Sequence, residues 1–283
     1  MHEPALRAAA FGAVPLLARP PGRPATPREA WLAAVVLGAQ GRYAAAATLL
    51  GGLRRGRDPL IASLAASALA SHRRQLGGHA AARPLDGEAF ALAAGLRTSP
   101  DPDGLDAAGA RADALLGLAA DNLAVGRIAA ARRLAARAGE QEAGWRAVVR
   151  GGWVGAEIEL AAGRAADAVA PARLALERAT AQEARRHVVK SGIVLAVALS
   201  AAGSPDHRHI TDTLVGNAIA DAEKCEFLSL LWPATLVAAD LRAGHAEEYR
   251  FRTARVLHAV LRSADPCGRR IARESAWVPG GGG

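Results

Sequence analysis

The pattern of apolar and polar positions predicts a chain of paired helices. Apolar residues recur at helical spacing from about residue 27 to residue 263, and the period-two alternation typical of strands is nearly absent. The clearest segment opens at residues 26–29 (Thr-Pro-Arg-Glu), which supply a hydroxyl N-cap, a proline at the first helical position and a carboxylate three residues after the cap. Gly41 ends this helix, and a second helix follows at 44–53 before Pro59. We therefore predict an all-α protein built from helix–turn–helix units.

A glycine recurs between two helical runs, in six similar motifs. They are AQGRYAAA at 39–46, QLGGHAAA at 75–82, AVGRIAAA at 124–131, AAGRAADA at 161–168, AAGSPDHR at 201–208 and RAGHAEEY at 242–249. In the second motif Gly77 fits the turn better than Gly78, because Ala70 precedes it and Ala82 follows it. The longest interval separates Gly77 from the glycine of the third motif and contains two prolines within 97–104, where we expect a loop between two groups of units.

These units resemble the tetratricopeptide repeat, in which a small residue in the first helix, a turn glycine, an apolar residue after it and an early alanine in the second helix recur together. The matching residues are Ala34, Gly41, Tyr43 and Ala46; Ala119, Gly126, Ile128 and Ala131; and Ala156, Gly163, Ala165 and Ala168. The resemblance implies a right-handed superhelix, a TPR-like α-solenoid, of about 10–13 helices in antiparallel pairs. The turn glycines lie further apart than in the 34-residue family repeat, and we expect Pro171 to interrupt the second helix of the fourth unit. We therefore expect an irregular superhelix.

Three regions follow from these boundaries. Residues 1–25 form an N-terminal arm, 26–263 the helical-repeat domain and 264–283 a tail whose glycine-rich end we expect to be disordered. In the tail, Trp277 either caps the last helix or is an exposed anchor, and we favour the cap. Gly151 and Gly152 lie inside a predicted helix, where either a close helix contact or a kink would explain them.

Composition changes this picture only slightly. The net charge is +8, and because only two of the 35 basic residues are lysines, 35 − 2 = 33 are arginines. This charge would attract nucleic acid or acidic partners. Codon bias that places arginines on solvated helix faces would also explain the charge, and we favour codon bias because no run of five like charges occurs. Two cysteines far apart in sequence suit a reducing cytoplasm, and no apolar run approaches the roughly 20 residues of a membrane helix.

The sequence lacks the signatures of common active sites, including a phosphate-binding loop, GxSxG and HExxH. Residues 206–209 (Asp-His-Arg-His) could hold a metal on a loop, but no second ligand cluster accompanies them. Glu183 and His187 lie four apart on one predicted helix face, where an ordinary side-chain pair is the simpler interpretation, and Cys225 suits a partly buried helix position. We expect no catalytic residues, no bound metal and no cofactor.

Repeat geometry supplies the candidate binding residues. In tetratricopeptide-like arrays, positions thirteen, ten and six before each turn glycine tend to face a concave groove. These positions hold Arg28, Arg150 and Lys190 at thirteen, Trp31 and Trp153 at ten, and Glu157 at six. Cations beside aromatic surfaces suit an acidic peptide or a carboxylate terminus. The alternative is that the tryptophans fill the core between helices and the arginines are solvated.

The leading hypothesis is a non-enzymatic helical-repeat protein, an adaptor or regulatory protein, that binds a protein or peptide in its groove. The alternative is a nucleic-acid-associated or transcription-linked regulator that uses its basic surface. Such arrays also occur as sensor regions of bacterial regulators, but the repeats here leave no room for a separate helix-turn-helix domain. If Arg150 is a solvated groove charge, Arg150→Glu should abolish partner binding with little loss of stability.

Overall fold

A computed structural model describes residues 2–13, 24–204 and 206–280, and the chain in these ranges is helical throughout, with no strand. The helices are α1 (Glu3–Phe11), α2 (Pro27–Ala39), α3 (Tyr43–Arg54), α4 (Pro59–Gln75), α5 (His79–Ala93), α6 (Ala107–Leu123), α7 (Ile128–Gly139), α8 (Trp145–Ala161), α9 (Ala165–Ala181), α10 (Arg185–Ala201), α11 (His207–Lys224), α12 (Leu228–Leu241), the 3₁₀ turn η1 (Ala243–His245), α13 (Ala246–Arg262) and α14 (Pro266–Glu274).

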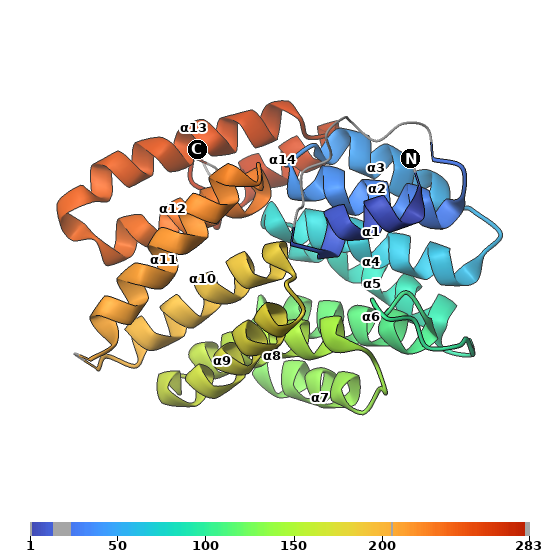
Figure 1. The fold of residues 1–283 in the computed structure, drawn as a ribbon, viewed down its shortest axis with the longest axis horizontal. Coiled ribbons are helices and arrows are strands. Elements are labelled where there is room, and N and C mark those ends of the chain that lie inside the picture. The colour runs from blue at the N-terminus through green and yellow to red at the C-terminus, as the bar shows by residue number, and fades with distance from the viewer. Residues whose placement is uncertain (1, 14–23, 205, 281–283) are drawn as a thin grey trace.

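Each helix packs mainly against its neighbours in sequence (Figure 1), which gives the stacked helix pairs of an α-solenoid. The all-α prediction is therefore confirmed. The described residues contain fourteen α-helices, slightly more than expected, because short helices also form in the segments assigned to the arm and the tail. The predicted N-cap of α2 is present: the Glu29 N–H donates to the Thr26 hydroxyl over 3.1 Å, and the Glu29 carboxylate accepts from the Thr26 N–H.

The turn glycines have the conformation that the repeat requires. Gly41, Gly77, Gly126, Gly163 and Gly203 all have φ between 72° and 79°, a region that glycine enters at little cost. Gly77 rather than Gly78 occupies the second turn, as predicted. The sixth unit differs, because its chain reverses through η1 without a glycine at positive φ.

The alanines predicted to lie at helix crossings are fully buried. Those in the three best-matching units that are 0% exposed are Ala34, Ala46, Ala119, Ala131, Ala156 and Ala168. Tyr43, just after the first turn glycine, is 1% exposed and is among the largest fully buried side chains. Small side chains at these crossings let paired helices approach closely, which is how an alanine-rich sequence builds a core.

The expected interruption at Pro171 is wrong, because α9 continues through it from Ala165 to Ala181. Opposite Pro171 lies Gly152 of α8. A Cβ atom at Gly152 would come within 2.6 Å of the Pro171 carbonyl oxygen and 2.9 Å of the Ala175 Cβ. At Gly152 the explanation is therefore a close helix contact, one of the two interpretations offered by the sequence. A Cβ atom at Gly151, in contrast, would have no neighbour within 4 Å.

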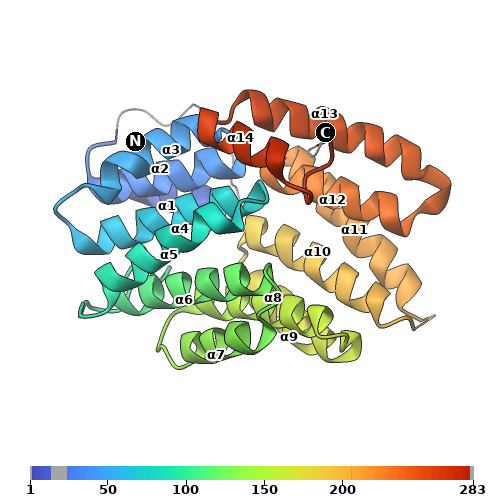
Figure 2. The ribbon, with the colours of Figure 1, turned by 180° about the vertical axis from the view of Figure 1, so that it is seen from behind.

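The last helices return to the first ones. Figure 2 shows α14 beside α3 and α4, and the Ala44 N–H donates to the Ser263 carbonyl over 2.8 Å. Tyr43 and Leu76 share one apolar cluster with Trp232 and Leu257. The two ends of the solenoid are thus in contact, so the described helices form a ring around the concave side that the sequence predicted as a groove.

The N-terminal helix α1 bridges the two halves of this ring by packing on α2 and α10. Its Arg7 forms ion pairs of 2.7 Å with Asp101 and 2.6 Å with Asp103, both in the loop predicted at 97–104. The Gly12 carbonyl accepts a hydrogen bond from the Arg185 N–H over 3.2 Å. The proline-rich part of the predicted arm, at 14–23, lies outside the described residues.

The tail packs back through a different residue from the one expected. Trp277 is 71% exposed, whereas Val278 is 3% exposed and joins the apolar cluster around Tyr43 and Leu76. Val278 therefore provides the apolar cap, and the capping role favoured for Trp277 is wrong. The predicted disorder of the glycine-rich end concerns residues 280–283, of which only Gly280 is described. Residues 281–283 lie outside the described residues.

Candidate ligand-binding cavity

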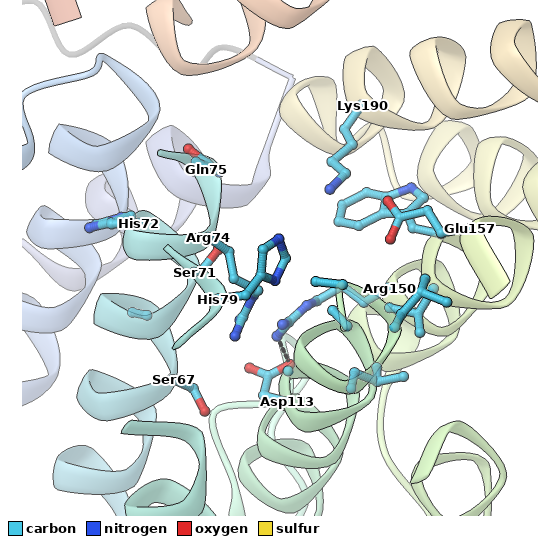
Figure 3. A pocket seen from close by; sticks show the side chains of 18 of the residues that line it. Ser67, Ser71, His72, Arg74, Gln75, His79, Asp113, Arg150, Glu157 and Lys190 are labelled. Carbon is cyan, nitrogen blue, oxygen red and sulfur yellow. Dashed lines mark hydrogen bonds and ion pairs between the residues drawn. The ribbon is translucent and has the colours of Figure 1, made fainter. Parts of the chain in front are cut away.

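The concave side holds a cavity of about 550 Å³. Its walls come mainly from α4, α6, α8 and α10, with further residues from α2, α5, α12 and the tail. The size is within the range of pockets that bind small molecules or short peptide segments. Figure 3 shows that charged side chains from facing walls extend into it: Arg74 from α4 and His79 from α5 on one side, Arg150 from α8 on the other, and Lys190 from α10.

Five of the six residues selected from repeat geometry line this cavity. They are Trp31, Arg150, Trp153, Glu157 and Lys190. Arg28 does not line it: it lies in the first turn of α2 and forms an ion pair of 3.2 Å with Asp101. The structure therefore places Arg28 with the loop that holds α1, away from the other five.

One side of the cavity contains a buried ion cluster around Arg74. Its guanidinium pairs with Asp86 and lies 3.4 Å from Asp121, and His79 Nδ1 lies 3.2 Å from the same Asp121. Both carboxylates are fully buried, and the absence of a side chain at Gly117 leaves room for Asp86. Burial raises the pKa of Asp86 to about 7, although Arg74 opposes this.

A second cluster joins α6 to α8. Asp113 accepts a hydrogen bond of 2.6 Å from Arg146 and another from Arg150 (Figure 3, dashed line). Burial tends to raise the pKa of Asp113, but the two guanidinium groups outweigh it and lower that pKa. Arg150 is thus a paired, largely buried side chain, and the expectation that it is a solvated groove charge is wrong.

Two cations on α10 differ from these because they have no carboxylate within ion-pair distance among the described residues. Burial lowers the pKa of Arg186 to about 10, and the nearby Arg146 and Arg150 lower it further. Burial also lowers the pKa of Lys190, a shift that Glu157 opposes. The Lys190 ammonium lies 4.8 Å from the centre of the Trp153 ring, a cation–π contact.

Aromatic side chains support this part of the cavity. Trp153 donates from Nε1 to Ser191 over 2.8 Å and stacks on His187 with ring centres 5.6 Å apart. His187 also contacts Trp145 and Phe11, so α1 contributes to the same aromatic cluster. Burial keeps the pKa of His187 well below its usual value, so this imidazole is neutral. These contacts hold Trp153 in a fixed orientation beside the cavity.

The predicted pairing of Glu183 with His187 on one helix face is wrong. Glu183 has φ 49° and lies in the turn that precedes α10, whereas His187 lies inside that helix. Cys225, at the end of α11, is buried as expected.

Sequence reasoning missed Arg74, His79 and Arg186 as cavity residues. For Arg186 a signal was present: it lies four residues before Lys190, so the two side chains share one face of α10. Arg74 and His79 gave no such signal, because they flank the turn at Gly77 rather than occupying the groove positions of the first helix.

Residues 206–209 form the start of α11 rather than a free loop, and within the described ranges no group of three or more His, Cys, Asp or Glu side chains gathers as metal ligands would. Across the same ranges, none of the helices combines the length and the apolar character required to cross a membrane.

No protein-family model matches this sequence, and a search of curated proteins found no match.

Proposed function

We propose that this chain is a non-enzymatic binding protein of tetratricopeptide-like helical pairs, and that its central cavity receives an acidic peptide segment of a partner protein. The observation that carries the proposal is that Arg186 and Lys190 line the cavity without an ion pair to any described carboxylate, and that Lys190 lies against the Trp153 ring. An acidic side chain would form charge-assisted hydrogen bonds with these groups. Trp153 would contact an apolar neighbour of that side chain.

The cavity chemistry supports binding rather than turnover. Two histidines on its wall, His72 and His187, are buried and have pKa values lowered by that burial, to about 3 for His72. Among the described residues neither has a carboxylate partner that would orient it as a general base. The third histidine of the wall, His79, does have one, because its Nδ1 lies 3.2 Å from Asp121, but that carboxylate also lies 3.4 Å from the Arg74 guanidinium. The carboxylates Asp113 and Asp86 are held by arginines. We therefore propose that the cavity recognises its partner without chemical change.

The test is fluorescence anisotropy with a fluorescein-labelled peptide rich in Glu and Leu, and with a matched peptide in which Gln replaces every Glu. We expect the full chain to bind the acidic peptide at least about tenfold more tightly, since one charge-assisted contact supplies that much. Lys190→Gln should remove most of the difference. The control variant is Arg255→Gln, which removes an exposed arginine of α13 outside the cavity. Equal affinity for both peptides, or equal effects of the two variants, would contradict the proposal.

A second candidate function, contact with nucleic acid, is favoured by the outer face of α13 and α14. Residues 246–274, which span both helices, contain seven arginines and four acidic residues, a net charge of 7 − 4 = +3. Phe251, Arg255, His258 and Arg262 are all exposed along one helix face.

A salt titration with labelled single-stranded DNA separates the two candidates. Phosphate contacts predict that the logarithm of the affinity falls steeply and linearly with the logarithm of salt concentration. Arg255→Gln combined with Arg262→Gln should then weaken DNA binding, whereas Lys190→Gln should leave it unchanged. DNA affinity that does not respond to the α13 variants would exclude this surface.

A further inference from the structure

The α10 wall of the cavity carries two cations, of which the repeat pattern selected only Lys190. Arg186 and Lys190 lie four residues apart on α10, one turn from each other, and both line the cavity. The pKa of each is lowered by burial and by the other cations nearby, so each is held in its charged form at a free-energy cost. An anion bound between them would relieve that cost.

Among the described residues Arg186 and Lys190 form no ion pair, and Glu157 compensates Lys190 only from beyond ion-pair distance. Arg74 pairs with Asp86 and Asp121, and Arg146 and Arg150 share Asp113. The cavity and the walls behind it together contain five cationic side chains and four carboxylates. The cations are Arg74, Arg146, Arg150, Arg186 and Lys190, and the carboxylates are Asp86, Asp113, Asp121 and Glu157. The count therefore leaves an excess of 5 − 4 = 1 positive charge among these groups.

The donors available near Arg186 suit an anion with several oxygens. The guanidinium offers a planar fork of N–H groups, and Lys190 adds a compact second charge. The Tyr43 hydroxyl donates to the Gln75 side-chain oxygen, which leaves the Gln75 amide N–H groups free to donate. Gln75 and Ser71 both line the cavity. A phosphate monoester carries about −1.5 to −2 at pH 7 and has three acceptor oxygens, so it can accept hydrogen bonds from both cations and from a neutral donor at the same time.

We propose that Arg186 and Lys190 form a phosphate-monoester site, with the organic part of the ester against Trp153. The inference rests on the proposed function, because it names the anion that the same cavity receives. The phosphate has two possible sources, a phosphorylated side chain of a peptide or a free phosphorylated small molecule, and both present the same group to the two cations.

Isothermal titration of the full chain with phenyl phosphate and with benzoate tests the site, since both probes have one phenyl ring and differ in the anion. We expect phenyl phosphate to bind at least about tenfold more tightly at pH 7.5. Its affinity should fall as pH drops below about 6, where the ester takes up its second proton. Arg186→Gln and Lys190→Gln should each reduce phenyl phosphate affinity about tenfold or more, and Arg255→Gln should leave it unchanged.

The two cavity variants are expected to fold, because each removes a half-buried charge that forms no ion pair with a described residue. A circular dichroism melt of each variant checks this. Equal affinity for phenyl phosphate and benzoate would overturn the proposal, as would phosphate binding that both cavity variants retain.

A second experiment, with peptides, identifies the source of the phosphate and distinguishes this inference from the proposed function. Three peptides are compared, with phosphoserine, serine or glutamate at one position of the Glu- and Leu-rich sequence. If the phosphoserine peptide binds best, and at least as tightly as phenyl phosphate, the source of the phosphate is a phosphorylated peptide. If phenyl phosphate binds but the phosphoserine peptide is not preferred over the other two, the source is a small phosphate ester. If glutamate and phosphoserine peptides bind equally and phenyl phosphate does not bind, the phosphate site is wrong while the proposed function stands. If no probe binds, both are wrong.

Discussion

Arg73 of α4 and Asp265, the N-cap residue of α14, form two hydrogen bonds of 2.6 Å each across 192 positions of sequence. Asp265 also accepts from the Gly268 N–H over 2.7 Å, so one carboxylate both starts α14 and fixes it to the first half of the chain. Burial tends to raise the pKa of Asp265, but the bonds from Arg73 and Gly268 outweigh it and lower that pKa. This ion pair links the two ends of the solenoid, together with the backbone hydrogen bond from Ala44 to Ser263.

Asp265→Asn should therefore destabilise the protein. Asparagine keeps the N-cap acceptor but loses the charge that pairs with Arg73, and the expected loss is about 1–3 kcal/mol in the free energy of unfolding, measured by urea denaturation. Glu247→Gln is the control, because its pair with Arg250 is exposed and should contribute less than about 0.5 kcal/mol. Equal, small losses in both variants would show that the end-to-end contact does not stabilise the fold.

The attachment of α1 should depend on pH through Asp101. Burial raises the pKa of this carboxyl, but hydrogen bonds from Arg7 and from the Asp103 and Leu105 N–H groups outweigh it and lower the pKa to about 2. Because the folded pKa lies below the unfolded value, the stabilisation is fully present above about pH 4 and disappears as pH falls toward 2. The contact is partly solvated, so we expect about 1 kcal/mol.

Comparison of the parent chain with Asp101→Asn tests this. The difference in unfolding free energy should be largest at neutral pH and should shrink between pH 4 and pH 2, because the parent carboxyl becomes protonated there while the amide does not titrate. Limited proteolysis at the N-terminus should report earlier release of α1 in the variant. A difference that stays constant with pH would show that the charge of Asp101 is not what matters.

The helix crossing at Ala156 predicts a packing defect in Ala156→Leu. Ala156 is 0% exposed and packs in one cluster with Ala168 and Ala172 of α9. The extra volume has no space there, so we expect a loss of about 1–3 kcal/mol, measured as a lower urea midpoint at unchanged slope. An unchanged midpoint would mean that α8 and α9 can separate at this point without cost.

The fold could be predicted to the extent that it depends on contacts between neighbours in sequence. The turn glycines and the buried alanines belong to one helix pair each, so their spacing alone located Gly77 and Ala156 correctly. The right-handed sense of the superhelix stays a prediction. Closure of the ring was not predictable, because it depends on pairs such as Arg73 with Asp265 that no local pattern connects.

In the candidate site, too, positions fixed within one repeat unit could be predicted, whereas contacts between units could not. Trp153, Glu157 and Lys190 were found from their offsets to turn glycines, since that offset fixes which face of the helix they occupy. The same offset failed for Arg28, because the loop at 97–104 comes from another unit and pairs with it. It also missed that Arg150 has a partner, Asp113, on the preceding unit.

The two adjacent glycines of α8 give a prediction in which neighbouring positions respond in opposite directions. Both lie inside the same helix, where alanine is favoured over glycine by about 1 kcal/mol. At Gly151 the space around a Cβ atom is open, so Gly151→Ala should stabilise the protein by about 0.5–1 kcal/mol.

At Gly152 the same methyl group would lie 2.6 Å from the Pro171 carbonyl oxygen, which belongs to the backbone of α9 and cannot rotate away. Gly152→Ala should therefore force α8 and α9 apart and destabilise the protein by about 1–3 kcal/mol despite the gain in helix propensity. Urea unfolding of both variants, followed by far-ultraviolet circular dichroism, measures the two effects under identical conditions. Because the substitutions are chemically identical and one residue apart, helix propensity cancels between them and the difference reports the contact with Pro171 alone. Stabilisation by both substitutions would mean that this contact does not determine how closely α8 and α9 pack.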